Sequence, residues 1–199
     1  MRQWRRFQML MVLMIMMIFS DLYAQNLSSP ELRTAATYSL WSPDQKSRVY
    51  LDNHHKPSLL VLLSPECPMC VNYIPLLKKL RKEYGDDIQI AGLIPGKTYD
   101  DSTVLNFSRN YEMNFPLYID SNMQLCKYLK AEVTPESYLF DKKGKLVYHG
   151  AIDNWLTALG KKRTRADQHY LLDAIEQMMK GNPVALSYIK PQGCLLNEY

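Results

Sequence analysis

The sequence carries little net charge of either sign. Its 199 residues have a formal charge of +4, which falls to +2 when the basic leader described below is removed. Binding to nucleic acid or to an anionic membrane surface depends on clustered positive charge. This small excess therefore gives no case for a nucleic-acid partner or for a role at a membrane surface.

The sequence also lacks an apolar run long enough to span a bilayer. Its longest run, from Met9 to Phe19, falls short of the ~18 apolar residues expected of a spanning helix. Three arginines precede the run, and Ala24 follows it as a small residue suited to cleavage. These features predict a secretory signal peptide at residues 1–24, with an uncleaved anchor as the alternative. We therefore expect an exported bacterial protein, periplasmic or otherwise extracytoplasmic, with no stable membrane span after leader cleavage.

Cysteine is scarce, and its spacing is informative. Four cysteines follow the leader, at Cys67, Cys70, Cys126 and Cys194, where export would let disulfides form and persist. A structural zinc site usually takes four ligands, often from two Cys-x-x-Cys pairs, and this sequence has one such pair. We therefore assign no metal site, and the chemistry of the Cys67–Cys70 pair becomes the main question.

Hydrophobic patterning predicts alternating strands and helices after the leader. The first half should contain an irregular segment at 25–34, a strand–turn–strand at 37–51, a buried strand at 58–63, a helix at 67–84 with Pro75 inside it, and a strand at 87–93. Gly85 is a natural stop for the helix. Strand, helix and strand of these lengths form a βαβ unit, whose two strands should be parallel.

The second half continues the pattern without an internal repeat or a second domain. We expect a helix capped by Asp101 or Ser102 and ending near Tyr111, a strand at 116–120, a helix from Ser121 to about Lys130, a hairpin over 136–150, and a helix at 165–180. Residues 183–199, which include Cys194, should form an irregular tail.

The position of Cys67 favours redox chemistry. It falls where the buried strand ends and the helix begins, and the free amides and dipole of a helix start stabilise an anion such as a thiolate. Pro68 suits the first helical turn because it has no N–H to leave unpaired. Cys70 follows at the spacing needed to attack a mixed disulfide on Cys67. These positions suggest Cys67 as the nucleophile and Cys70 as the resolving thiol.

Two stretches carry a family resemblance. "CPMCVNYIPLLKKL" after "SLLVLLS", together with "VTPESYLFDKKGKLVYHG", resembles the thioredoxin-like superfamily, and within it the exported redoxin branch of TlpA/ResA-like thiol-disulfide oxidoreductases and AhpC/TSA redoxin domains. The resemblance covers residues 35–182. It implies a thioredoxin fold, which is an α/β fold with a central mixed sheet flanked by helices, here with an N-terminal β-hairpin and a helical insertion at 101–130.

The resemblance also implies a mechanism and a substrate site. Pro135 matches the cis-proline of the family, and Thr134 and Pro135 would line the groove for protein thiol and disulfide substrates. The partners would be such substrates and an upstream redox protein. No organic cofactor is needed, because the Cys67–Cys70 pair carries the electrons as a redox-active disulfide. Many family members have Trp before the first cysteine, whereas Glu66 here should raise the pKa of Cys67 relative to them.

Three other readings of the cysteine pair stay open. Sco copper chaperones share the fold, but their cysteines are normally three residues apart and their histidine would fall near Val133, whereas this chain has His149 one strand later and His54-His55 before the core strand. A peroxiredoxin-like thiol peroxidase would use Ser64 before the reactive cysteine, but its proline is replaced by Leu60. The third reading is a static local disulfide.

The remaining polar and sulfur groups have simpler expected roles. Cys126 lies at helical spacing with Met123 and Leu129, as a small buried hydrophobe would. Cys194 could pair with Cys126, fold back to Cys67 or bind another chain, so it is a candidate third redox cysteine. Asp153 should hold a turn, with a catalytic role as the alternative. We expect solvent exposure for His169 and for the basic run Lys161-Lys162-Arg163.

Overall fold

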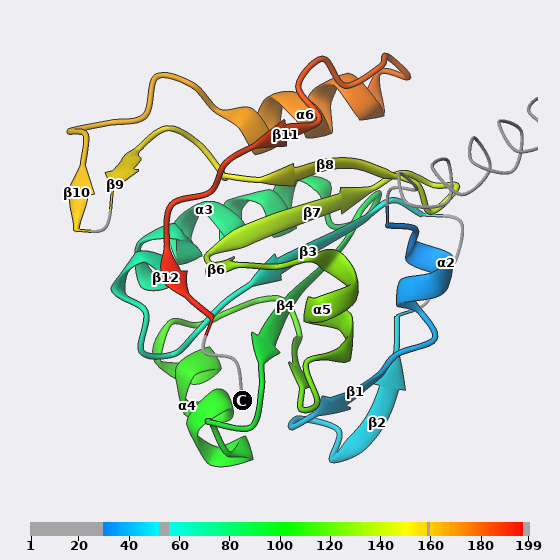
Figure 1. Cartoon of the computed structure of the whole chain (residues 1–199), viewed down its shortest axis with the longest axis vertical. Helices are drawn as coiled ribbons and strands as arrows, with labels where there is room; N and C mark the ends of the chain where they lie inside the picture. The colour runs from blue at the N-terminus through cyan, green and yellow to red at the C-terminus, as the bar shows by residue number, and fades with distance from the viewer. Residues whose placement is uncertain (1–29, 52–55, 159, 197–199) are drawn as a thin grey trace, which may run out of the picture.

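The computed structural model describes residues 30–51, 56–158 and 160–196, so the signal peptide expected at residues 1–24 and the pair His54-His55 lie outside the described residues. An eight-stranded mixed sheet in the order β11-β8-β7-β3-β4-β5-β1-β2 forms the centre of the described part (Figure 1). Its strands are β1 (Ser39–Ser42), β2 (Ser47–Tyr50), β3 (Ser58–Leu62), β4 (Gln89–Pro95), β5 (Leu117–Asp120), β7 (Glu136–Phe140), β8 (Leu146–Gly150) and β11 (Tyr188–Ile189).

The strand β3, which is the apolar run predicted as the central strand, lies inside the sheet between β7 and β4. β3 is parallel to β4 and antiparallel to β7, and all of its residues are buried. Because side chains alternate across a strand, Leu59 and Val61 join one core while Leu60 and Leu62 join the other. A strand covered on both faces must be apolar at every position, which explains the unbroken run.

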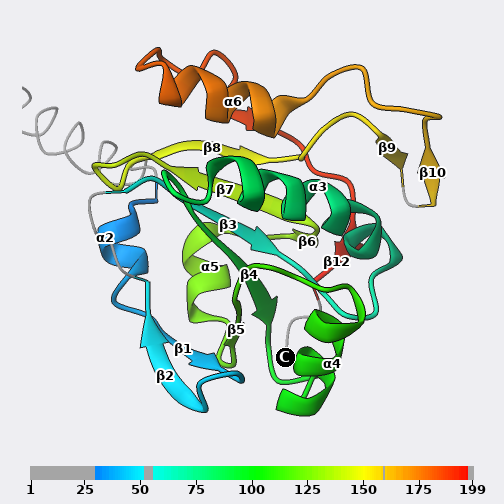
Figure 2. The ribbon, with the colours of Figure 1, turned by 180° about the vertical axis from the view of Figure 1, so that it is seen from behind.

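Helices cover both faces of the sheet (Figures 1 and 2). They are α2 (Leu32–Ala35), α3 (Pro68–Tyr84), α4 (Asp101–Asn110), α5 (Gln124–Leu129) and α6 (Tyr170–Met179). The helices α3, α4 and α6 contribute to the core that contains Leu59, and α5 packs on the opposite face with Leu60. Figure 2 shows α3 in front of the sheet and α6 at its upper edge, next to β8 and β11. The β3–α3–β4 unit, the antiparallel β7–β8 hairpin and the final helix α6 make up the predicted thioredoxin fold, with the N-terminal hairpin β1–β2 beside β5.

Several predicted ends differ from the structure. The cap of α4 is Asp100 rather than Asp101 or Ser102, because the Asp100 carboxylate accepts a hydrogen bond from the Thr103 amide at 2.8 Å. At α5 the N-cap is Met123 rather than the expected Ser121, and the Asp120 carboxylate accepts hydrogen bonds from the amides of Gln124 and Cys126. A side-chain acceptor of this kind satisfies amides that have no partner within the helix.

Other differences concern the lengths of elements. The last helix begins at Tyr170 rather than at residue 165, and before it β9 (Leu156–Ala158) pairs with β10 (Lys161–Lys162). The segment 25–34, expected to be irregular, contains the first residues of the short helix α2. Gly85 ends α3 as predicted, although its φ of −67° is not the left-handed conformation that favours glycine.

The C-terminal tail is the largest difference from the sequence prediction. It was expected to be irregular, but β11 adds to the edge of the main sheet beside β8, and β12 (Cys194–Leu195) pairs antiparallel with β6 (Val133–Thr134). In Figure 1 the red tail runs from the sheet edge at β11 down to β12, across the loop before α3. A Cβ on Gly150 would meet the carbonyl oxygen of Ile189, so glycine permits the close approach of β11.

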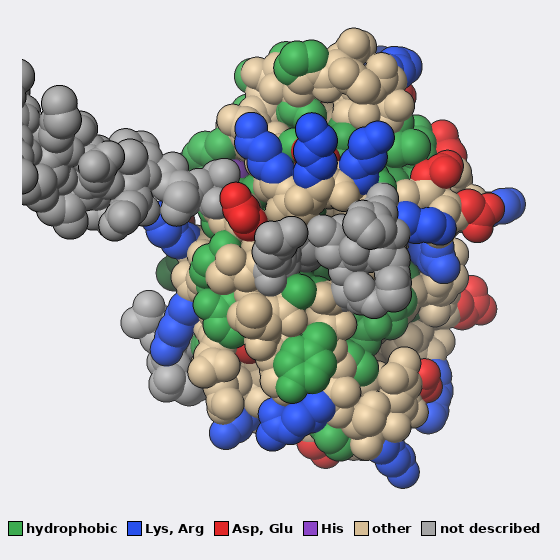
Figure 3. All heavy atoms as spheres, turned by 90° about the vertical axis from the view of Figure 1, so that its right-hand side faces the viewer, with side chains coloured by type: hydrophobic (Ala, Val, Ile, Leu, Met, Phe, Trp, Pro, Cys, Tyr) green, Lys and Arg blue, Asp and Glu red, His purple; other side chains and the backbone are tan. Residues whose placement is uncertain are grey.

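Two features of the described residues bear on membrane contact: the apolar character of the helices and the charge on the surface. Within residues 30–51, 56–158 and 160–196, no helix combines the length and apolar character needed to cross a bilayer. On the face drawn in Figure 3, basic and acidic side chains are mixed with separate hydrophobic groups. This mixture agrees with the small formal charge of the sequence.

Candidate active site

Cys67 occupies the junction of β3 and α3. It is the N-cap of α3, with extended backbone at φ −86° and ψ 109°, and Pro68 follows as the first helical residue. The Cys67 carbonyl accepts hydrogen bonds from the amides of Cys70 and Val71, at 3.0 and 3.3 Å. The buried strand therefore fixes the start of the helix, and the helix start fixes the position of the Cys67 side chain.

Two segments far apart in the sequence cover the sulfur of Cys67. The Cys67 thiol is 3.3 Å from the carbonyl oxygen of Thr134, to which it donates when protonated, and its Sγ is 2.7 Å from the Sγ of Cys194. These neighbours leave Cys67 only 2% exposed. All four cysteines are free thiols, so the Cys67–Cys194 contact is not a covalent bond.

The surroundings of Cys67 favour its thiolate. The pKa of Cys67 is lowered to about 4, chiefly by the hydrogen bond from the Cys70 thiol and against the opposing effect of burial. The Cys194 thiol and the backbone of Cys70 add smaller lowering contributions. Because the thiolate is the nucleophilic form of cysteine, this thiol is poised for attack at neutral pH.

Cys70 has the opposite character. It is fully buried, its Sγ accepts a hydrogen bond from the Ser64 amide at 3.4 Å, and burial raises its pKa well above the usual value of a thiol. The nearby charge of Cys67 raises it further. The two thiols therefore have opposite acidities, with the pKa of Cys67 lowered and that of Cys70 raised.

Glu66, which the sequence suggested would raise the pKa of Cys67 relative to Trp-containing relatives, contacts Tyr99. It is exposed, it is not among the groups that shift the pKa of Cys67, and its carboxylate accepts a hydrogen bond from the Tyr99 hydroxyl at 3.3 Å. The Tyr99 oxygen also lies 2.9 Å from the hydroxyl of Ser64. Tyr99, in the loop after β4, was missed by the sequence analysis because no motif marks it.

Thr134, which was expected to line the substrate groove, has its carbonyl oxygen 3.3 Å from the Cys67 thiol, and its peptide bond to Pro135 is cis. Thr134 lines a pocket of about 230 Å³ together with Cys67 and Cys194. Pro135 lines a separate pocket of about 320 Å³ with Tyr73 and Asp153. Tail residues line both pockets, so β12 and the residues before it pass between the two parts of the expected substrate groove.

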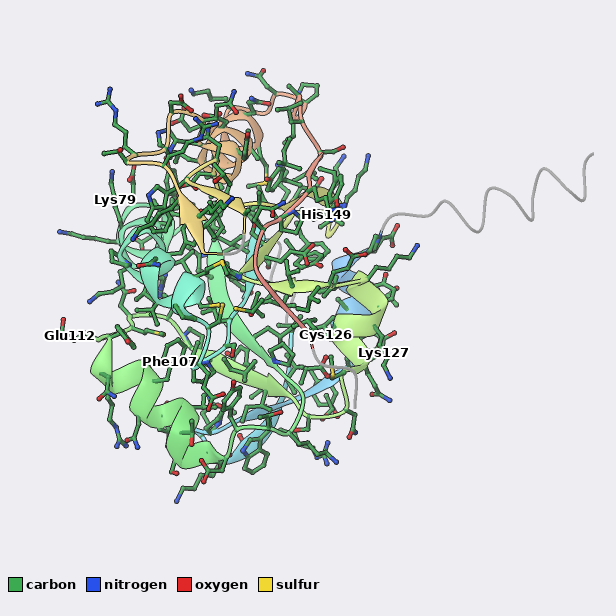
Figure 4. The ribbon with its side chains drawn as sticks, turned by 60° about the vertical axis from the view of Figure 1, so that its left-hand side comes forward. Lys79, Phe107, Glu112, Cys126, Lys127 and His149 are labelled. Atoms are coloured by element: carbon green, nitrogen blue, oxygen red, sulfur yellow. The ribbon has the colours of Figure 1, made fainter. Side chains whose placement is uncertain are left out.

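The other sequence candidates lie away from the thiols or have structural contacts. Cys126 on α5 is buried in the core on the opposite face, and burial raises its pKa, which agrees with the prediction of a small buried hydrophobe. Figure 4 shows Cys126 and His149 on different parts of the molecule. His149 stacks on Tyr138 and packs at a tilt against Tyr188, and its Nδ1 is 4.0 Å from the carboxylate of Glu136.

Asp153 has the turn-holding role expected of it. Its carboxylate accepts a hydrogen bond from the Trp155 amide at 2.8 Å and another from the Tyr73 hydroxyl at 2.5 Å. It therefore ties the chain after β8 to the helix that starts at the cysteine pair. Lys161, Lys162, Arg163 and His169 are exposed as predicted.

Within the described part of the chain, no group of three or more His, Cys, Asp or Glu side chains is arranged to hold a metal ion. The sulfur atoms of Cys67, Cys70 and Cys194 form a set that can exchange disulfides, since the Cys67 thiolate has a thiol neighbour on either side.

Known proteins resemble this chain in sequence and fold. The thiol-disulfide oxidoreductase YkuV of Bacillus subtilis is 25% identical over 113 residues, which cover 55% of this chain and 76% of YkuV. The thiol-disulfide oxidoreductase ResA of Bacillus thuringiensis is 30% identical over 82 residues, but the match spans only 46% of ResA and 41% of this chain. The crystal structure of hypothetical protein SMc02350 from Sinorhizobium meliloti superposes with a TM-score of 0.70 at 22% identity, covering 79% of this chain and 88% of that one.

The family assignment rests on a longer match than that of either relative. The sequence model of the AhpC/TSA family matches residues 35–149, more than half of the chain, from the start of the N-terminal hairpin region through the β7–β8 hairpin. This segment contains the cysteine pair and the Thr134–Pro135 bond. The chain therefore belongs to the AhpC/TSA family, within the thioredoxin-like superfamily.

Proposed function

We propose that this protein is a thiol-disulfide oxidoreductase that exchanges electrons with protein thiols and disulfides through Cys67 and Cys70. The observation that carries the proposal is the opposite character of the two thiols. The pKa of Cys67 is lowered to about 4 while that of Cys70 is raised, and the thiol of Cys70 donates a hydrogen bond to Cys67. The relatives named thiol-disulfide oxidoreductases support the same chemistry.

The reaction begins with the Cys67 thiolate. It attacks one sulfur of a substrate disulfide, forms a mixed disulfide, and expels the other substrate sulfur as a thiolate. Cys70 then loses its proton and attacks the Cys67 sulfur, which releases the second substrate thiol and leaves a Cys67–Cys70 disulfide. The substrate gains two electrons and the protein loses two. With a dithiol partner the same steps run in reverse.

The pKa of Cys70 explains the order of these steps. Part of its rise comes from the charge on Cys67, and that charge disappears when Cys67 enters a mixed disulfide. Cys70 therefore becomes easier to deprotonate only after the first step. Protein substrates would lie against Thr134 and Pro135, beside Cys67.

The proposal includes export and an upstream redox partner. Export rests on the signal-peptide pattern at residues 1–24 and places the cysteines where disulfide exchange partners occur. The proposed boundaries are a leader at 1–24, a redoxin domain at 35–182 and a tail at 183–199. A copper chaperone of the Sco type would need a histidine beside the two thiols, whereas His149 packs against Tyr138 and Tyr188. A thiol peroxidase would use Ser64, whose hydroxyl instead lies against Tyr99.

The proposal is tested by reduction of a protein disulfide. The reduced full chain should cleave the interchain disulfides of insulin in the presence of dithiothreitol, and Cys67→Ser should abolish the acceleration. The double variant Cys70→Ser/Cys194→Ser should instead accumulate a mixed disulfide between Cys67 and an insulin chain. Equal insulin reduction by Cys67→Ser and the unaltered chain would refute the proposed function.

A further inference from the structure

The C-terminal tail brings a third cysteine into the site. Cys194 and Thr134 are paired residues of the antiparallel β12–β6 ladder, and the next pair is Leu195 with Val133. The amide of Leu196 extends the contact by donating to the Glu132 carbonyl at 2.9 Å. The tail therefore lies as an added strand along the segment that precedes Pro135, where a protein substrate is proposed to bind.

The tail is shaped for this position. A Cβ on Gly193 would meet the carbonyl oxygen of Thr134, so only glycine lets the chain approach this closely before Cys194. Upstream, β11 is held against β8, where the amide of Ala151 donates to the Ile189 carbonyl at 2.9 Å. The β11–β8 pairing before residues 190–193 and the β12–β6 pairing after them therefore fix the position of Cys194.

The sulfur atoms complete the arrangement. The Sγ atoms of Cys67 and Cys194 are 2.7 Å apart, beyond the ~2.05 Å of a disulfide but with no room for another atom between them. Cys194 is partly exposed on the groove side of Cys67, whereas Cys70 is fully buried on the helix side. An incoming sulfur must displace the tail, and after it has reacted with Cys67 the tail cysteine is the nearest thiol on that side.

We propose that residues 193–196 act as a tethered substrate and that Cys194 is a third redox cysteine, which forms a reversible disulfide with Cys67. This inference rests on the proposed function, because it assigns a further partner to the same nucleophile. Cys194 attacks the Cys67 sulfur of a mixed disulfide, loses its proton to solvent, and expels the substrate thiolate. Cys70 then attacks Cys67, frees Cys194 and leaves the Cys67–Cys70 disulfide.

The pKa of Cys194 supports the proposed order of steps, in which Cys194 attacks only after Cys67 has entered a mixed disulfide. The pKa of Cys194 is raised to about 12, first by burial and then by its hydrogen bond to Cys67 and the charge on Cys67. The contributions of Cys67 vanish when Cys67 is in a mixed disulfide. A tethered thiol also reacts at a high effective concentration, because its attack is intramolecular.

The test removes Cys70 and follows the fate of Cys67. The reduced full chain carrying Cys70→Ser is mixed with one equivalent of oxidised glutathione, quenched with acid at intervals, and analysed by mass spectrometry with disulfide mapping. We expect a glutathione adduct on Cys67 that decays as a Cys67–Cys194 disulfide forms within one chain. The added oxidised glutathione accounts for both electrons, since it leaves as two thiols.

Two matched variants serve as controls in the Cys70→Ser background. Cys194→Ser should make the glutathione adduct persist, and Cys126→Ala, which removes the cysteine in the opposite core, should leave the conversion unchanged. A persistent adduct with Cys194 still free to alkylate would overturn the inference. Disulfides formed only between two chains, at a rate that rises with protein concentration, would overturn it as well.

The outcomes separate this inference from the proposed function. If Cys194→Ser alone still forms the Cys67–Cys70 disulfide while Cys70→Ser keeps its adduct, only the tethered-substrate inference fails. If Cys67 reacts with oxidised glutathione in none of these variants, the proposed function fails too.

Discussion

The hydrogen bond from Cys70 to Cys67 should have a measurable effect on the reactivity of Cys67. It is the largest contribution that lowers the pKa of Cys67, which lies at about 4. A hydrogen bond to a charged group is worth about 1.5–3 kcal/mol, and one pKa unit corresponds to about 1.4 kcal/mol. Replacing Cys70 with alanine should therefore raise the pKa of Cys67 by roughly one to two units.

The assay is the pH dependence of Cys67 alkylation by iodoacetamide, with the modified residue identified by mass spectrometry. In the unaltered chain the rate should rise through about pH 4 and then reach a plateau, because the thiolate is the reactive form. In Cys70→Ala the midpoint should move to higher pH. Cys70→Ser keeps a hydroxyl donor and should show a smaller movement, and Cys126→Ala should show none. An unchanged midpoint in Cys70→Ala would refute this account of the thiolate.

Three further predictions concern the tail, the turn after β8 and the core. Gly193→Val should push β12 off Thr134 and speed alkylation of Cys67 severalfold, because its side chain would meet the Thr134 carbonyl; an unchanged rate would mean that the tail does not shield the thiol. Asp153→Ala removes the carboxylate that accepts from the Tyr73 hydroxyl and should lower the free energy of unfolding in urea by about 1.5–3 kcal/mol. A decrease below ~0.5 kcal/mol would contradict the stabilising role given to the Tyr73–Asp153 hydrogen bond. Leu77→Ala should lower the free energy of unfolding by about 2–5 kcal/mol in the same assay, because Leu77 is fully buried on α3. Lys79→Ala, at an exposed position on the same helix, is the control and should change it little, so equal losses in the two variants would contradict the packing.

The centre of the fold could be predicted from the sequence because its signals are local. The apolar run at 58–63 marks a strand buried on both faces, and the apolar positions of 67–84 repeat with the period of a helix. Cys67 lies between these two segments, so its place at a helix start followed from the sequence. The resemblance supplied Thr134 and Pro135, and the structure places Thr134 against Cys67 with a cis bond to Pro135.

The contacts of the tail could not be predicted in the same way. The strands β11 and β12 have two residues each, too few to show a period, and their pairing partners lie far away in the sequence. Gly193 beside Cys194 was the only local sign of a close approach. The predicted cap of α4 was wrong for a related reason. Asp100, Asp101 and Ser102 are adjacent residues that can all cap a helix, and only the path of the chain selects Asp100.

The central claim is that Cys67 and Cys70 form a redox-active couple, and a redox titration tests it most directly. The full chain carrying Cys194→Ser, which leaves Cys67 with Cys70 as its neighbouring partner, would be equilibrated in graded glutathione buffers, and its free thiols trapped and mapped by mass spectrometry. The account predicts one reversible two-electron transition in which Cys67 and Cys70 lose their free thiols together. A pair that stays fully reduced or fully oxidised across the whole series would contradict it.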